Sequence, residues 1–246
     1  MFGTENLGEQ ALNKIAKLAL SSQLEDSDSL EVKIKTTPEK LASGGLDSLL
    51  IEGEGLVIET DLRLQVLEIA MKEIAVAPLK ALTGNIELTK STEGTARIVL
   101  TQSDLNRALN SPELRTKINV LETYLSTEQI KLTVPQKKCQ LREDGKVGVE
   151  ALVILQPSGE SFEVAFTTTP KIVQGGRSVI LEDIQYEPGK EISDELTQGF
   201  LDKAGKMLDL RNFEKKGLAL RIHSLNVESG QITLLAKADI TQFPTL

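Results

Sequence analysis

The chain has 246 residues, of which 40% are hydrophobic and 26% are charged, as in an ordinary soluble globular protein. Its 28 Lys and Arg against 36 Asp and Glu give a net charge of −8, which argues against a surface that neutralises nucleic-acid phosphates. Aromatic residues make up 3% and Trp is absent, so stacking platforms for bases are scarce. One Cys and one His exclude an internal disulfide and the usual structural zinc site.

The first part of the chain predicts one helix followed by strands. Apolar residues recur at three- and four-residue spacings over residues 7–22, which is typical of an amphipathic helix. Residues 30–100 are predicted as strands, beginning with the alternation of Leu30, Val32 and Ile34 with charged residues. The glycines at 53 and 55 indicate a bend, and residues 78–82 a short helical turn.

A slip in the apolar alternation between residues 62 and 76 predicts a β-bulge. Bulged long strands are typical of strongly curved sheets, so we expect the sheet to curl.

The second part predicts a helical insert at 101–117, strands at 118–187, a helix at 193–208 and closing strands at 214–242. Thr101 or Ser103 is the expected cap of the insert, and Pro112 the start of a second short helix. Asp144-Gly145 predicts a hairpin, followed by a strand whose residues 147, 149, 151, 153 and 155 share one face. No linker divides the sequence, so residues 1–246 are predicted to form a single α+β domain. In it, a long, strongly curved antiparallel sheet wraps around amphipathic helices.

Motifs for bond-making chemistry are missing. His223, the only imidazole, is out of phase with its apolar neighbours and is expected to face solvent, and Cys139 is expected to be a half-buried small hydrophobe. Asp26-Ser27-Asp28 lacks the glycine and distal glutamate of a calcium loop, and the lysine pairs at 137–138 and 215–216 are interpreted as solvated faces. We therefore expect no catalytic residue, no metal and no cofactor.

The positive signal is aliphatic. A sheet that curls around amphipathic helices encloses an elongated apolar interior, which is a core if side chains fill it and an acyl-chain groove if they do not. Sequence leaves both readings open. The residues expected to line a groove lie on the apolar sides of the two long helices: Leu12, Ile15, Ala19, Leu196, Phe200, Ala204 and Leu208.

Several segments, spread in order along almost the whole chain, resemble a known family. They are Thr101-x-x-Asp104-Leu105-Asn106-Arg107-Ala108-Leu109, Leu210-Arg211-Asn212-Phe213-Glu214, Ile240-Thr241-Gln242-Phe243-Pro244, residues 49–57 and Asn85-Ile86-Glu87-Leu88. Together they are similar to the LmeA-like phospholipid-binding family. The resemblance implies a tubular lipid-binding-like fold and non-enzymatic binding of phospholipids, including phosphoinositides, in support of membrane or envelope lipid metabolism.

The sequence and the resemblance together predict binding, with transfer as an extension, of a phospholipid or similar amphiphile in an aliphatic groove. A structural or assembly protein that docks a partner protein through a sheet edge or an apolar patch is the alternative. An esterase would need a nucleophile beside His223. Expected partners are a lipid and transiently a membrane, not nucleic acid. Residues 1–9 lack the features of a secretory signal and no apolar run could span a bilayer, so a cytoplasmic or membrane-peripheral location is expected.

Overall fold

The computed structural model describes residues 7–59, 61–77, 88–112, 120–125, 128–156, 158–211 and 218–241. The chain is α+β, with antiparallel strand pairs and a few helices, as predicted. It divides into two compact units. Unit 1 comprises Met1–Val99, Leu210–Ser224 and Leu234–Leu246, and unit 2 comprises Leu100–Asp209 and Leu225–Thr233. The single domain over residues 1–246 stays a prediction, and each unit is described by itself.

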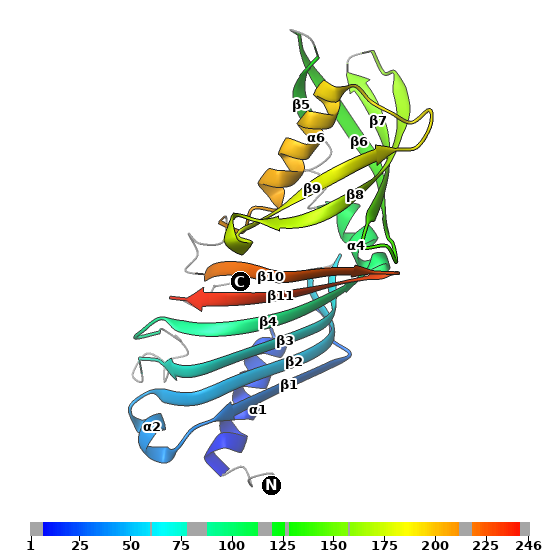
Figure 1. Ribbon diagram of the computed structural model, residues 1–246. Helices are drawn as coiled ribbons and strands as arrows, with labels where there is room; N and C mark the ends of the chain where they lie inside the picture. Colours follow the sequence, from blue (N-terminus) through cyan, green and yellow to red (C-terminus); the bar gives the residue numbers. More distant parts are fainter. Residues whose placement is uncertain are drawn as a thin grey trace. The chain divides into compact units, whose positions relative to one another are not determined.

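Unit 1 holds most of a six-stranded sheet, whose strand order is β1-β2-β3-β4-β11-β10 (Figure 1). Its first strand follows helix α1, and the short helix α2 joins the first two strands. The elements are α1 (Leu7–Ser21), β1 (Ser29–Lys35), α2 (Pro38–Ala42), β2 (Gly45–Glu59), β3 (Leu62–Ala75), β4 (Thr92–Thr101), β10 (Leu218–Glu228) and β11 (Gln231–Ile240).

The alternation predicted for the first strand is confirmed, because Leu30, Val32 and Ile34 are all buried while their neighbours on β1 are exposed. The bulge expected between residues 62 and 76 is corrected. The pairing of β2 with β3 shifts its register only at Val57/Glu59. Glu73, between Met71 and Ile74, has a φ of 53°, and both Met71 and Ile74 belong to one core cluster. The register of β3 with β2 is the same on both sides of Glu73, so β3 has no extra residue there.

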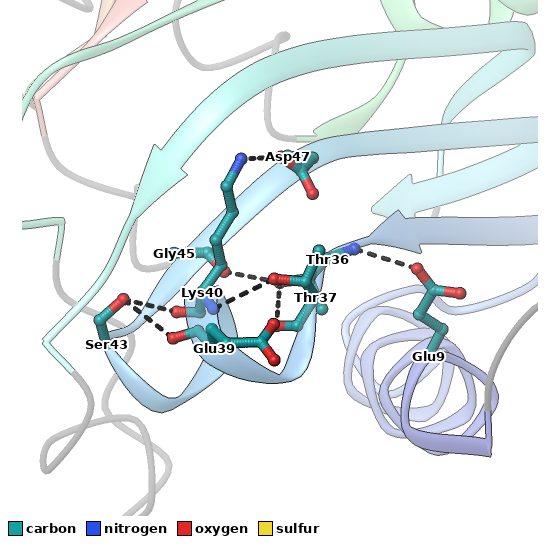
Figure 2. Close-up of polar contacts among 8 residues, drawn as sticks. All are labelled: Glu9, Thr36, Thr37, Glu39, Lys40, Ser43, Gly45 and Asp47. Atoms are coloured by element: carbon teal, nitrogen blue, oxygen red, sulfur yellow. Dashed lines mark hydrogen bonds and ion pairs between the residues drawn. The ribbon is translucent and has the colours of Figure 1, made fainter.

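Helix α2 interrupts a region that was predicted as strands. Thr37 begins it by accepting a hydrogen bond from Lys40 N at Oγ1, and Pro38 occupies the first turn (Figure 2). The hydroxyl of Thr36 donates to Gly45 O at 2.8 Å, which joins the end of β1 to the start of β2. The Thr-Pro pair is a helix-start signal that the alternation argument overlooked. The helical turn expected at 78–82 lies outside the described residues, as do the residues after Pro112 over which the second short helix was expected.

Unit 2 contains a five-stranded antiparallel sheet in which consecutive strands are neighbours. The predicted hairpin at Asp144-Gly145 joins its second and third strands. Helices precede and follow the sheet in the chain. Of the candidate starts Thr101 or Ser103, and Ser193 or Asp194, the observed N-caps are Thr101 and Ser193. The elements are α4 (Gln102–Leu109), β5 (Val120–Leu125), β6 (Glu128–Leu141), β7 (Val147–Gln156), β8 (Ser161–Val173), η1 (Gln174–Gly176), β9 (Ser178–Tyr186) and α6 (Asp194–Met207).

Helix α4 caps a free strand edge with amide side chains. Among the described residues, β5 pairs with β6 over Glu128–Thr133, and no described strand pairs with the later part of β6 on that side. There Gln102 Oε1 accepts from Leu141 N at 2.8 Å, Asn106 Oδ1 accepts from Cys139 N at 2.7 Å, and Asn106 Nδ2 donates to Cys139 O at 2.8 Å. We call the set Gln102, Asn106 and Asn110 the amide ladder; its third member donates to Lys137 O at 2.8 Å.

The amide ladder can form because the rise of four helical residues nearly equals the rise of two strand residues. Four helical residues rise about 6 Å, and two strand residues rise about 6.6 Å. Amides four apart on a helix therefore meet backbone groups two apart on a strand that runs beside it.

Candidate functional site

Helix α6 is positioned along an edge of the five-stranded sheet. Ser193 Oγ accepts from Leu196 N at 3.3 Å, and Asp194 and Glu195 complement the positive end of the helix. Near the start of the helix, the hydroxyls of Tyr186 and Thr197 lie 2.6 Å apart. At its end, Val179 N donates to Leu208 O at 3.3 Å. Both ends of α6 are thus attached to β9.

The same helix also contacts β5, the opposite edge strand of that sheet. In Figure 1, α6 (orange) lies across the open side of the curled sheet between β5 and β9. This is the sheet-around-helix arrangement predicted from the sequence, here within unit 2 alone.

The interior under the start of α6 is filled by side chains. Leu196 is 8% exposed and packs with the fully buried Leu132 and Val153. Phe200 packs against the same cluster, as do Phe166 and Tyr186, whose rings meet edge to face at 5.6 Å. The predicted common face of β7 is consistent with this, because Ala151, Val153 and Leu155 all belong to the cluster.

Burial decreases along the apolar side of α6. Leu196 is 8% exposed, Phe200 and Ala204 are half-buried, and Leu208 is 38% exposed. Met207 beside it is 41% exposed, and a Cβ on Gly205 would meet no atom within 4 Å. The helix is therefore closely packed at its start and opens toward its end.

The predicted residues of the first helix are placed differently. Helix α1 turns polar side chains to the edge of β1: Asn13 Oδ1 accepts from Ile34 N at 2.7 Å and Glu9 Oε1 accepts from Thr36 N at 3.1 Å. Leu12 is half-buried, Ile15 is 64% exposed and Ala19 is exposed. These three belong to unit 1, and the other four predicted residues, on α6 and at its C-cap, belong to unit 2. The structure brings Leu196 and Phe200 together in one core and leaves Ile15, Ala19 and Leu208 at the surface.

The two candidate reactive groups belong to different units. His223 on β10 is exposed, as predicted. Cys139 is more buried than expected, at 7% exposed, and this desolvation raises its pKa from 9.0 to about 11. A thiol with that pKa stays protonated at neutral pH and is a poor nucleophile.

Two open hollows have mixed linings. One of ≈ 270 Å³ lies over unit 1 and includes Arg97, Glu68 and His223. The other, ≈ 490 Å³, lies in unit 2 beside Lys137 and Lys138. In the second hollow, Lys137 Nζ donates to Val134 O at 2.8 Å, and Lys138 Nζ lies 3.8 Å from Glu150 Oε2. Neither hollow is the aliphatic groove that was predicted.

The described ranges contain no group of His, Cys, Asp and Glu side chains that could hold a metal ion. None of the described helices has the length and apolar character needed to cross a bilayer.

A curled sheet with an apolar interior and a helix across its open side defines a candidate amphiphile-binding protein. The model of one family, LmeA-like phospholipid-binding, matches residues 3–237, and the chain belongs to this family. The resemblance inferred from the sequence is thereby confirmed, and membership supports lipid binding as the general function. No significant match was found among the curated proteins or the solved structures.

Proposed function

We propose that the protein binds a phospholipid without catalysing a reaction on it, and that an acyl chain lies beneath the C-terminal half of α6. The observation that carries this proposal is the loss of packing along α6, from Leu196 at 8% exposed to Leu208 at 38%. A ligand entering there would complete an apolar face that the protein leaves partly open. The family match supports phospholipid as the class of ligand.

The driving force is burial of hydrocarbon. Each methylene removed from water contributes about 0.8 kcal/mol, so an acyl segment of several carbons offsets the cost of ordering the chain. Ala204 suits such a site because its small side chain keeps the helix close to the ligand without filling the space. Phe200 forms the closed end, since it packs against the core cluster.

Cations near the open end suit a phosphate headgroup. Lys203 is half-buried on α6, and Lys206 is exposed in its last turn. Arg177 precedes Ser178, which forms a β-bridge with Asp209 just beyond the helix. Lysines in the last turn also offset the negative end of the helix dipole, which otherwise disfavours an anion.

The proposal includes no catalysis, no cofactor and no metal. His223 is exposed in unit 1, and Cys139 is a buried, protonated thiol in unit 2, so neither supplies a nucleophile with a base beside α6. Carrying the lipid, in support of membrane or envelope lipid metabolism, and a cytoplasmic or membrane-peripheral location belong to the same proposal.

Mass spectrometry of organic extracts from the purified full chain tests the proposal. We expect phospholipid at close to one molecule per protein, and uptake of labelled phospholipid from vesicles by stripped protein. Ala204→Phe fills the proposed space and is expected to lower uptake by about tenfold, because several methylene contacts are lost.

Gln198→Phe is the matched control, since Gln198 is on the exposed side of the same helix and bonds Asp202 at 2.7 Å. It adds a larger, aromatic side chain away from the site and should bind as the wild type does. The proposal would be overturned if the wild-type protein neither carried nor took up phospholipid. Equal uptake by Ala204→Phe and Gln198→Phe would show that the lipid does not lie beneath α6.

Docking of a partner protein through the β1 edge or the later β6 edge is less favoured by the geometry. The β1 edge and the later β6 edge already bond side chains of α1 and α4. An edge whose N–H groups are occupied offers less to an incoming strand.

A further inference from the structure

Helix α1 presents large aliphatic side chains to solvent. Leu18 is 62% exposed and Ile15 is 64% exposed, the highest values among the large hydrophobic residues described. Scattered exposed leucines are ordinary on protein surfaces. Ile15 and Leu18 are neighbours on one helix, and we call this pair the aliphatic stripe. Adjacent exposed aliphatic side chains are typical of a surface that binds a partner.

The attachment of α1 to β1 sets the direction of this stripe. Glu9 reaches from the helix to Thr36 N, as Figure 2 shows looking along the helix, and Asn13 reaches Ile34 N. At about 100° per residue, Leu18 lies roughly 180° around the helix from Glu9. The hydrogen bonds that hold α1 to the sheet edge therefore turn the stripe outward.

Basic residues flank the stripe on one side. Lys14 and Lys17 are exposed, and on the helical wheel they follow Leu18 on the side away from Ile15. Glu9 is the only acidic residue in the sequence of α1, and it is occupied by Thr36 N. A chain with net charge −8 thus carries a locally cationic and aliphatic helix face.

We propose that α1 is a docking helix for an anionic bilayer surface, with Ile15 and Leu18 inserted among the headgroups and Lys14 and Lys17 against lipid phosphates. Interfacial helices combine an apolar stripe with flanking lysines in this way. The charge pattern favours an anionic bilayer over a second copy of the chain, because a symmetric contact between two α1 faces would bring Lys14 and Lys17 of both copies close together, and like charges repel. This surface lies in unit 1 and is separate from the acyl-chain site proposed on α6.

Vesicle flotation with the full chain tests the proposal. We expect binding to phosphatidylcholine vesicles that contain phosphatidylglycerol, little binding to pure phosphatidylcholine, and weakening by salt. Lys14→Glu with Lys17→Glu should reduce binding at least about tenfold. Ile15→Ser with Leu18→Ser should reduce it about tenfold through lost hydrocarbon contact.

Each pair has a matched control of the same chemistry. Lys72→Glu with Lys90→Glu changes the net charge equally at exposed positions away from α1, and Leu41→Ser with Leu62→Ser removes two other leucines, each 37% exposed. Both controls should bind as the wild type does. The lysine variants change only exposed side chains, so circular dichroism should stay native and the test does not depend on a core substitution.

The proposal would be overturned if the wild-type protein did not bind anionic vesicles. It would also be overturned if the control variants lost binding as strongly as the α1 variants. Concentration-dependent dimerisation that Ile15→Ser with Leu18→Ser abolishes would overturn it too, since it assigns the stripe to a second copy of the chain. A parallel measurement of bound lipid distinguishes loss of vesicle binding from loss of the site on α6. The α1 variants should still retain a lipid that is already bound.

Discussion

Helices α1 and α4 perform the same task in different units and differ in what their apolar residues do. Each runs beside a strand edge and lets polar side chains four residues apart bond backbone groups two residues apart. In α4, Leu105 and Leu109 pack into the core cluster around Cys139. In α1, Ile15 and Leu18 face solvent. Covering an edge and building a core are therefore separable uses of a helix.

The two attachments also differ in strength. Asn106 bonds both the N–H and the carbonyl of Cys139, which is 7% exposed. Asn13 accepts one hydrogen bond, from Ile34 N. Because an unsatisfied buried group costs more than a lost bond near water, α4 should be held more firmly than α1.

The largest expected effect comes from breaking the amide ladder. Asn106→Ala leaves the N–H and the carbonyl of Cys139 without their side-chain partner, and should lower the free energy of unfolding by about 2–4 kcal/mol. Urea denaturation followed by circular dichroism measures it. Asn226→Ala is the matched control, since its amide bonds only exposed Glu228, and it should change little. Equal effects of the two substitutions would show that the ladder does not support β6.

A pH experiment tests whether water is excluded from the Cys139 thiol, on the side of β6 that α4 covers. Burial raises the pKa of Cys139 from 9.0 to about 11, so the folded chain keeps a proton that the unfolded chain releases. The contribution of the thiol to stability is therefore full below pH 9 and declines as pH rises toward 11, by about 2–3 kcal/mol in all. Unfolding free energies measured across that window should fall more steeply for the wild type than for Cys139→Ala. Parallel slopes would mean that the thiol is solvated.

A smaller effect is expected at α1. Asn13→Ala removes one hydrogen bond and should cost about 0.5–1 kcal/mol, partly offset by the higher helix propensity of alanine. Asn13→Asp keeps the accepting oxygen and should stay near the wild-type value. Hydrogen exchange at the Ile34 amide checks this directly, because protection should fall in the alanine variant and persist in the aspartate variant. If Asn13→Ala lowered the free energy of unfolding as much as Asn106→Ala does, α1 would be held as firmly as α4, contrary to the comparison above.

Local patterns predicted local structure well. The alternation at Leu30, Val32 and Ile34 predicted a half-buried strand. Thr101 and Ser193 were each one of two predicted cap candidates, because a polar side chain before an apolar run satisfies the first backbone N–H groups. The Asp-Gly turn after β6 was predicted for the same kind of reason. These features depend on residues close together in the chain.

Relations between distant segments could not be predicted in this way. Periodicity shows that Leu12, Ile15 and Ala19 share one side of a helix, but not whether that side meets protein or solvent. The answer depends on Asn13 finding the free N–H of Ile34, a contact between segments 21 residues apart. One signal was present: Glu9 and Gln102 each stand three residues before a Leu-Asn pair followed by a basic residue, so the capping pattern occurs twice.

Photo-crosslinking maps the lipid most directly. A phospholipid with a diazirine at the end of an acyl chain, bound to the full chain and activated, is expected to label the peptide that contains Ala204 and Leu208, with little label in the peptide that contains Ile15 and Leu18. Label confined to the α1 peptide, or spread evenly over the chain, would contradict the account of α6 as the cover of the acyl chain.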